Sequence, residues 1–283
     1  MCGIYGIIHL DGSPADPSLM QSMGDVTRHR GPDDHGWHHD GNCVIGMRRL
    51  SIIDLTGGHQ PLTNEDNSLW LVCNGEIYNF RELREELTNL GHRFRTGSDC
   101  EVILHAYEAW GEGFVSRLNG MYNFALWDAN RRRLLLGRDR IGVKPLYWRQ
   151  DGQRLAFATE AKALLALPGV TAEVDRAALA SYLNLGYVSA PRSMFKGTSK
   201  LPVANLMSIE SGQVSTRCYW SLPETVDSGV SEGEWIERIA NGIDRAVRMQ
   251  MVSDVPIGAF LSGGVDSSAV VACMAGATSQ PVK

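Results

Sequence analysis

The second residue of the chain most constrains what it can fold into. Cys2 directly precedes an alternating, β-branched run over residues 3–10, which predicts a strand that starts at the cysteine. Removal of the initiator methionine would leave Cys2 first, with a thiol and a free α-amine on one residue. Their reference pKa values are about 8.5 and about 8, so the amine can accept the thiol proton near neutral pH. No signal peptide is recognisable before it. Taken alone, a cysteine here also fits a buried apolar residue.

Composition narrows the class of protein. The 283 residues are 43% hydrophobic and 21% charged, with a net charge of -5, as in ordinary globular chains. No basic run predicts nucleic-acid binding, and no apolar run is long enough for a membrane span. The six cysteines show no paired spacing, which favours reduced thiols and a cytoplasmic protein. A zinc site at His35, His38, His39 and Cys43 is disfavoured because the spacing fits no standard ligand pattern.

The first 160 residues alternate predicted strands with helices. Helical spacing is present over residues 17–28, about 80–90 and the segment that follows Asp99. Asn79 with Glu82 predicts a capping box at the second helix. Asp175 is expected to cap a helix through Leu185, and residues 221–231 read as a linker. Strands are predicted at residues 44–50, 51–55, 69–73, 121–127, 133–138, 146–148 and 155–159.

The pattern changes after the linker. Ser231 and Glu234 form a second predicted capping box ahead of a long helix. Val255–Leu261 is a continuous apolar run, expected in a parallel sheet buried on both faces. It is followed by Ser-Gly-Gly-Val-Asp-Ser-Ser at 262–268 and then a small-residue helical segment. Glycines and a helix N-terminus let several N–H groups face one anion, so this loop predicts a phosphate site without the Walker A ending.

These two signals together carry a resemblance to a known family. Ser262–Ser267 is similar to the pyrophosphate loop of the N-type ATP pyrophosphatases, and Met1–Ile4 resembles the start of class II glutamine amidotransferases. In this order they resemble the glutamine-hydrolysing asparagine synthetases. Further matching segments are 28–33, 49–54, 60–62, 74–79, 98–101 and 138–147.

The resemblance implies a role for each matching residue. Cys2 would attack the glutamine amide and form a thioester, and Asn74 with the N–H of Gly75 would hold the oxyanion. Arg49 would bind the α-carboxylate of glutamine, and Asp99 with Glu76 its α-ammonium. The implied glutamine-binding set also includes Leu50, Ile52 and Ile53. The implied nucleotide site, which takes ATP with Mg²⁺ at Asp266, comprises Leu261, Ser262, Gly263, Gly264, Asp266, Ser267 and Ser268.

The implied architecture is α+β with two domains. Residues 1–215 would form a four-layer αββα N-terminal-nucleophile glutaminase domain, and residues 216–283 the beginning of an α/β parallel-sheet ATP pyrophosphatase domain. Ammonia would pass through an internal channel to an ATP-activated carboxylate, aspartate by default. Family members continue beyond residue 283, so this chain is expected to hydrolyse glutamine without amide transfer. A homodimer is left open.

Three alternatives remain at this point. The acceptor could belong to a surface-polysaccharide or peptide pathway, since close relatives amidate other carboxylates. An amidase that acts on a different amide without transfer is a second reading, and a glutamine-sensing module without catalysis is a third. Arg49 and Asp99 argue against the amidase, and Cys2 with Asn74 and Gly75 against the sensor.

Overall fold

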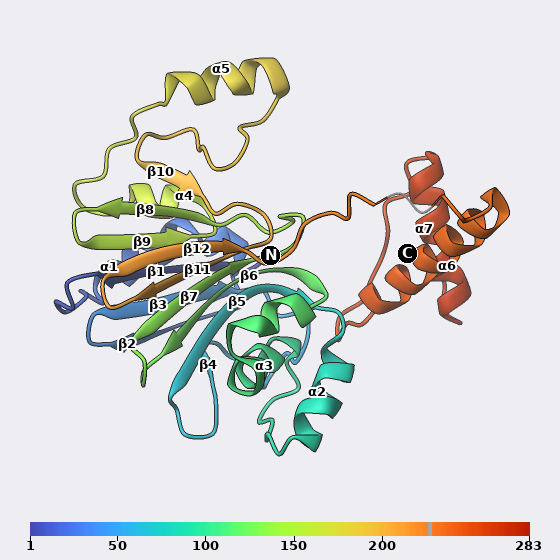
Figure 1. The fold of residues 1–283 in the computed structure, drawn as a ribbon, viewed down its shortest axis with the longest axis horizontal. Helices are drawn as coiled ribbons and strands as arrows, with labels where there is room; N and C mark the ends of the chain where they lie inside the picture. The colour runs from blue at the N-terminus through green and yellow to red at the C-terminus, as the bar shows by residue number, and fades with distance from the viewer. Residues whose placement is uncertain (226–227) are drawn as a thin grey trace. The chain divides into compact units, whose positions relative to one another are not determined.

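The computed structural model describes residues 1–225 and 228–283. The chain divides into two compact units (Figure 1). The first comprises Met1–Ser51 and Thr56–Ser221, and the second Ile52–Leu55 and Leu222–Lys283. The predicted linker at 221–231 includes residues 226–227, which lie outside the described residues.

The first unit is built on two antiparallel sheets. The strand order is β10-β8-β9-β1-β3-β2 in one sheet and β12-β11-β7-β6-β5-β4 in the other. The strands of the first sheet are β1 (Gly3–His9), β2 (Asp34–Asp40), β3 (Cys43–Arg49), β8 (Tyr147–Asp151), β9 (Arg154–Ala158) and β10 (Thr198–Lys200). Those of the second are β4 (Leu62–Thr63), β5 (Leu69–Ile77), β6 (Gly120–Asp128), β7 (Arg133–Arg138), β11 (Asn205–Glu210) and β12 (Gln213–Cys218).

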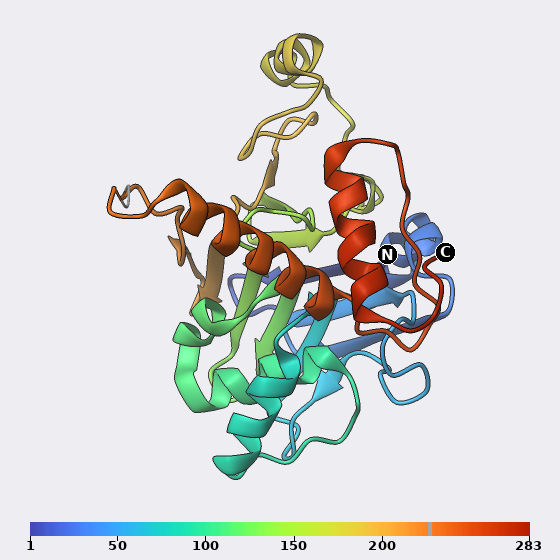
Figure 2. The ribbon, with the colours of Figure 1, turned by 90° about the vertical axis from the view of Figure 1, so that its right-hand side faces the viewer.

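Helices cover both outer faces of this pair of sheets. On the first sheet lie α1 (Leu19–Val26) and α4 (Ala161–Leu165), whose side chains share a core with Tyr5 and Ile7 of β1. On the second lie α2 (Phe80–Asn89) and α3 (Val102–Trp110), side by side in Figures 1 and 2. A further helix, α5 (Arg176–Leu185), precedes β10. The order of layers is helix, sheet, sheet, helix, as predicted for the first domain.

The main core fills the space between the sheets. Ile4, Ile8 and Met47 of the first sheet pack with Val72 and Trp127 of the second, and all five are buried. The alternation of a strand explains this division, because Ile4 and Ile8 of β1 point inward while Tyr5 and Ile7 point to the helices. This alternation determines which side chains of β1, β3, β5 and β6 face the space between the sheets.

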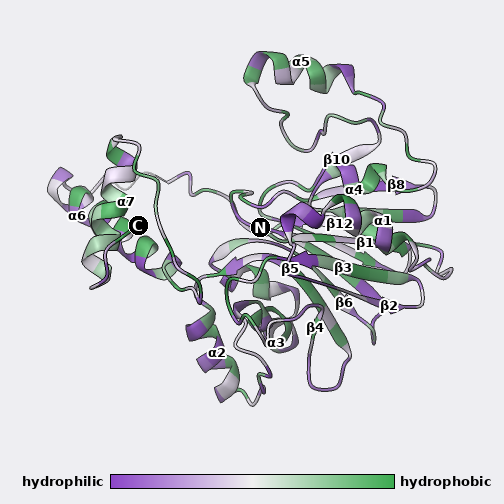
Figure 3. Cartoon of the chain, turned by 180° about the vertical axis from the view of Figure 1, so that it is seen from behind, coloured by the Kyte–Doolittle hydropathy of each residue, from purple (hydrophilic) through white to green (hydrophobic). Residues whose placement is uncertain are grey.

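The second unit is helical. Its two helices, α6 (Glu232–Gln250) and α7 (Val265–Ala277), pack against each other, and Figure 3 shows hydrophobic residues interspersed along both. None of the residues of α6 is buried. Ser231 caps α6 by accepting a hydrogen bond from the Glu234 N–H, which is one half of the predicted capping box.

The prediction of a buried parallel strand at Val255–Leu261 was wrong. These residues form neither helix nor strand, and no strand lies within the described residues of 222–283. A strand needs a neighbour to pair its N–H and C=O groups, and no such neighbour is present among them. Phe260 is fully exposed and Leu261 is 62% exposed, so the apolar run is not covered.

Two further local predictions were also wrong. Residues 51–55 do not form a strand. Asn79 does not cap α2, because its side chain bonds elsewhere: it accepts from the Asn119 N–H and donates to the Arg117 carbonyl. Asp175, in contrast, caps α5 through the N–H groups of Ala177 and Ala178.

Candidate active site

Strand alternation brings three of the predicted glutaminase residues to the same space between the sheets. Cys2 is two residues from Ile4, Arg49 two from Met47 and Asn74 two from Val72, and each of those apolar residues faces the inner core. Residues two apart on a strand share a face, so Cys2, Arg49 and Asn74 also face inward. Arg49 is 5% exposed and Asn74 is 1% exposed. Because β1 pairs with β3 so that Gly3 faces Arg48, Cys2 and Arg49 lie at the same end of the sheet.

The backbone of Cys2 is held by a buried arginine. The Nε–H of Arg30 donates to the Cys2 carbonyl oxygen at 2.7 Å, and Nη1 of Arg30 lies 2.8 Å from Oε1 of Glu160. Arg30 can approach so closely because Gly31, the next residue, lies against the backbone of β3. A Cβ on Gly31 would fall 2.3 Å from the carbonyl carbon of Arg48. The residue that precedes β1 is therefore positioned by a loop 28 residues away.

The surroundings of the Cys2 thiol favour its protonated, neutral form. Sγ lies 3.5 Å from the Leu50 carbonyl oxygen and accepts from the Leu50 N–H at 3.3 Å. Burial raises the pKa of the thiol, against a smaller lowering by the Leu50 N–H and the charge of Arg49. A buried thiol of raised pKa is a weak nucleophile, so attack on a substrate requires a base that removes its proton.

The terminal amine adjoins this thiol. In the chain that begins with Met1, partial burial lowers the pKa of the α-amine, and the positive charges of Arg30 and Lys144 lower it further. A lower pKa increases the neutral fraction of an amine at neutral pH, and only the neutral form accepts a proton. Although the Cys2 thiol opposes this shift, the net effect favours the neutral form of the Met1 amine.

Asn74 presents a buried donor that the folded chain does not use. Its Nδ2 is buried and has no hydrogen-bond partner among the described residues. An unpaired buried donor costs about 1–3 kcal/mol, and a substrate oxygen that accepts its hydrogen bond would offset that cost. Gly75 follows it, where β5 and β6 approach so closely that a Cβ would lie 2.1 Å from the Met121 carbonyl oxygen. Only glycine fits there, and the strand holds Asn74 and Gly75 rigidly.

Two carboxyl groups lie at the end of the same strand. Oδ2 of Asp99 accepts from the Ile77 N–H at 2.7 Å, which ties the start of the 99–101 helical turn to β5. Burial raises the pKa of the Asp99 carboxyl group. Burial also raises the pKa of Glu76, and the negative charge of Asp99 adds to this, while Lys144 opposes it. A cation bound between them would lower both values.

The remaining predicted residues fall into two groups. Leu50 is placed with Cys2 by the hydrogen bonds given above. Ile52 and Ile53 belong to the segment Ile52–Leu55 of the second unit, so their part in a glutamine site stays a prediction.

The predicted nucleotide loop forms a serine-rich turn at the start of α7. Gly263 has a positive φ of 83°, a conformation that favours glycine. Oγ of Ser262 lies 3.0 Å from Oγ of Ser267, and Ser268 donates to the Gly264 carbonyl at 2.8 Å. Asp266 is exposed in the first turn and does not cap α7. The loop joins no strand, in contrast to the prediction.

Sequence reasoning missed residues that organise the site without carrying its chemistry. Arg30 lies in segment 28–33, which contributes to the family resemblance, but no role was predicted for its side chain. Asp139 is fully buried and accepts from the N–H groups of Tyr122, Val143 and Lys144, which fixes the 139–144 loop. Asn123 pairs opposite Asn74 across the sheet, and its Oδ1 also has no partner among the described residues. No sequence signal pointed to it.

The histidines of the disfavoured zinc site are spread along β2. His38 stacks on Trp70 with ring centroids 3.7 Å apart, and Nε2 of His39 bonds the Gly41 carbonyl. Cys43 is buried. Among the described residues, no cluster of potential metal ligands includes them.

The fold defines a class of protein. The structure resembles the glutamine phosphoribosylpyrophosphate amidotransferase from B. subtilis complexed with ADP and GMP, with a TM-score of 0.56 at 18% identity. The match covers 100% of this chain and 65% of that one. The architecture is thus that of the class II glutamine amidotransferases, with two antiparallel sheets and a short helical C-terminal part.

The sequence comparisons define the family. A glutamine amidotransferase domain model matches residues 1–220, and an asparagine synthase model matches residues 238–283. Asparagine synthetase [glutamine-hydrolyzing] 3 of Bacillus subtilis is 37% identical over 280 residues, which is 98% of this chain and 45% of the relative. A putative asparagine synthetase [glutamine-hydrolyzing] of Methanocaldococcus jannaschii is 36% identical over 297 residues, which is 97% of this chain and 57% of that protein.

The chain belongs to the glutamine-hydrolysing asparagine synthetase family. It spans about half the length of the curated relatives it matches, and only a fragment of the synthetase domain is present. No helix in the described part of the chain has the length and apolar character of a membrane span.

Proposed function

We propose that this chain hydrolyses glutamine at Cys2 and supplies the ammonia for ATP-dependent formation of an amide. The observation that carries the proposal is the unpaired, buried Nδ2 of Asn74, which faces the same inter-sheet space as the Cys2 thiol and Arg49. A preorganised oxyanion site contains a hydrogen-bond donor that has no protein partner until the substrate oxygen occupies the site. The acceptor is a carboxylate, with aspartate as the family default.

Recognition of glutamine follows from the charges around the site. The guanidinium of Arg49 binds the α-carboxylate in a bidentate manner that lysine cannot reproduce. The carboxyl groups of Asp99 and Glu76 hold the α-ammonium. Burial raises the pKa of both carboxyl groups. A bound ammonium group would stabilise their ionised forms and so offset the cost of burying two negative charges. The pair therefore selects an amino acid over a simple amide.

The chemistry begins with proton transfer from the thiol. After removal of Met1, the α-amine of Cys2 accepts the Sγ proton, and the thiolate attacks the side-chain carbonyl carbon of glutamine. The carbonyl electron pair moves onto oxygen, where Nδ2 of Asn74 and the N–H of Gly75 donate hydrogen bonds to it. The proton returns from the amine to the leaving nitrogen, and ammonia departs. Water then attacks the γ-glutamyl thioester, glutamate leaves, and the thiol is restored.

The C-terminal unit would carry the start of the synthetase half. The hydroxyls of Ser262, Ser267 and Ser268 and the α7 N-terminus suit the phosphates of ATP. Asp266 offers one exposed carboxylate. It would bind Mg²⁺ only together with phosphate oxygens of ATP, which would complete the coordination of the ion. ATP would make the acceptor carboxylate reactive by converting it to an adenylate. The division into a glutaminase domain at 1–215 and a synthetase domain from 216 remains our proposal.

The test is a pair of assays on this chain. We expect it to release glutamate and ammonia from glutamine, and Cys2→Ala to abolish both without a change in circular dichroism. Asparagine and amides without an α-amino acid group should be poor substrates. We expect no ATP–pyrophosphate exchange. Hydrolysis of simple amides at equal rates would favour the amidase, and glutamine binding without hydrolysis would favour the sensor.

A further inference from the structure

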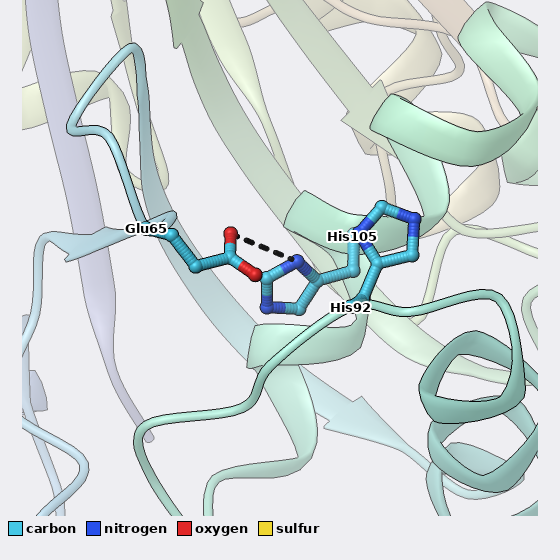
Figure 4. Close-up of side chains that lie close together, drawn as sticks. All are labelled: Glu65, His92 and His105. Atoms are coloured by element: carbon cyan, nitrogen blue, oxygen red, sulfur yellow. Dashed lines mark ion pairs between the residues drawn. The ribbon is translucent and has the colours of Figure 1, made fainter.

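A cluster of histidine and carboxylate side chains lies away from the residues assigned to glutamine. Glu65 comes from the β4–β5 connection, His92 follows α2, and His105 and Glu108 lie on α3 (Figure 4 shows the first three). One nitrogen or oxygen atom from each of Glu65, His92 and His105 lies within 4.8 Å of the others. His105 is fully buried, His92 is half-buried and Glu65 is exposed, so the cluster opens to solvent on one side.

Glu108 completes the cluster. Its Oε2 lies 2.8 Å from Nδ1 of His105 and 3.5 Å from Nδ1 of His92. Nδ1 of His105 lies 3.8 Å from Oε2 of Glu65. Ligands about 2.0–2.1 Å from a tetrahedral zinc ion are about 3.3 Å from one another. The three observed separations bracket that value, so shifts of about 0.5 Å would bring them to it.

Neighbouring groups already hold the ligand atoms in place. Oε1 of Glu65 accepts from the Arg93 N–H, and Oε1 of Glu108 accepts from Nδ2 of Asn64. In each carboxylate one oxygen is thus occupied while the other, Oε2, faces the cluster. Fixed ligands reduce the entropy lost when an ion is bound.

A buried carboxylate lies near the nitrogen of His105 that points away from the cluster. Nε2 is buried and has no hydrogen bond among the described residues, and Oε1 of the buried Glu101 lies 3.7 Å from it. Metal-bound histidines usually donate this second N–H to a carboxylate, which fixes the tautomer with the other nitrogen free for the metal. Glu101 is well placed for this, since the Arg95 N–H and Thr96 already hold its carboxylate.

We propose that Glu65, His92, His105 and Glu108 bind one divalent transition-metal ion of the zinc class. The ion takes the position between Nδ1 of His105 and Oε2 of Glu108, and the proton shared there is released to solvent. Two imidazoles and two carboxylates in a tetrahedral set suit Zn²⁺ or Co²⁺ rather than Mg²⁺ or Ca²⁺, which prefer oxygen. A set of four protein ligands indicates a structural role: the ion ties the β4–β5 connection to α2 and α3.

The proposal is tested with the metal alone on the full chain. We expect calorimetric titration with Zn²⁺ to show one bound ion per chain, and Co²⁺ to give the intense visible absorption of a tetrahedral site without a thiolate charge-transfer band. That spectrum separates this site from ions bound at exposed cysteines. Bound Zn²⁺ should also raise the melting temperature.

Variants assign the site. Glu65 is exposed and His92 is half-buried, so we expect His92→Ala and Glu65→Gln to leave the core intact. Each should weaken Zn²⁺ binding at least tenfold. His39→Ala, at a histidine outside the cluster, is the matched control and should bind like the unmodified chain. Absence of stoichiometric Zn²⁺ binding, or equal affinity in His92→Ala and the unmodified chain, would overturn the proposal. Glutaminase activity is measured separately and does not bear on either outcome.

Discussion

The proposed role of Asn74 as oxyanion donor predicts opposite effects of its replacement on stability and on activity. Its Nδ2 is buried and unpaired, so replacement by leucine, of similar volume, removes an unsatisfied donor. Relief of that donor is worth about 1–3 kcal/mol, from which imperfect packing of the new side chain subtracts. We therefore expect Asn74→Leu to keep or raise the free energy of unfolding.

The same substitution should nearly abolish glutamine hydrolysis. Loss of one oxyanion donor typically lowers turnover by about 10²–10³, equivalent to about 2.7–4 kcal/mol of transition-state stabilisation. KM for glutamine should change little, because the donor acts mainly when charge has developed on the oxygen. Steady-state release of glutamate and urea unfolding of the same samples measure the two effects.

Asn42 provides the matched control. It is also buried, but its Nδ2 donates to the His9 carbonyl and its Oδ1 accepts from Arg132. Asn42→Leu should therefore lower the free energy of unfolding by about 2–4 kcal/mol and leave glutamine turnover unchanged. If Asn74→Leu were destabilised as strongly as Asn42→Leu, or if it retained full turnover, Asn74 would be a structural residue and the reasoning would be refuted.

Three further predictions concern the surroundings of Cys2. Active protein should begin at Cys2, and an intact mass that still includes Met1 would exclude the amine as base. Arg49→Lys should raise KM for glutamine more than it lowers kcat, and the reverse split would count against a carboxylate contact. Burial alone would raise the pKa of Glu160, but hydrogen bonds from Arg30, Lys162 and His29 lower it from 4.5 to about 2. Its contribution to stability is complete above about pH 4.5 and is lost as pH falls towards 2, so Glu160→Gln should flatten acid unfolding curves in that window.

The sequence predicted the first unit well because its elements are local. The strand after Cys2 and the strands predicted at 121–127 and 133–138 follow from their local residue pattern, and the structure confirms them as β1, β6 and β7. Cys2, Asn74 and Arg49 were selected from the motifs that contain them, and their roles stay predictions. Once the sheet pairing is known, the alternation of side chains along each strand shows that all three residues face the space between the sheets.

What was missed depends on partners that are distant in the sequence. The role of Arg30 requires that a loop reach back to the Cys2 carbonyl, and the orphaned Nδ2 of Asn74 is visible only when its neighbours are placed. Val255–Leu261 has the composition of a buried strand, yet composition cannot supply the neighbour that a strand needs. Asn79 resembles a helix cap, but a tertiary contact with the 117–119 segment takes its side chain.

The most direct test of the central claim is to trap the nucleophile. A diazoketone analogue of glutamine alkylates the thiol that attacks the γ-carbonyl position, and peptide mass spectrometry then locates the adduct. We expect one adduct per chain, on Cys2, formed in step with loss of glutaminase activity and slowed by excess glutamine. Cys218 is exposed and provides an internal control for non-specific alkylation. Complete inactivation with the label on Cys73 or Cys218 and an unmodified Cys2 would contradict the account.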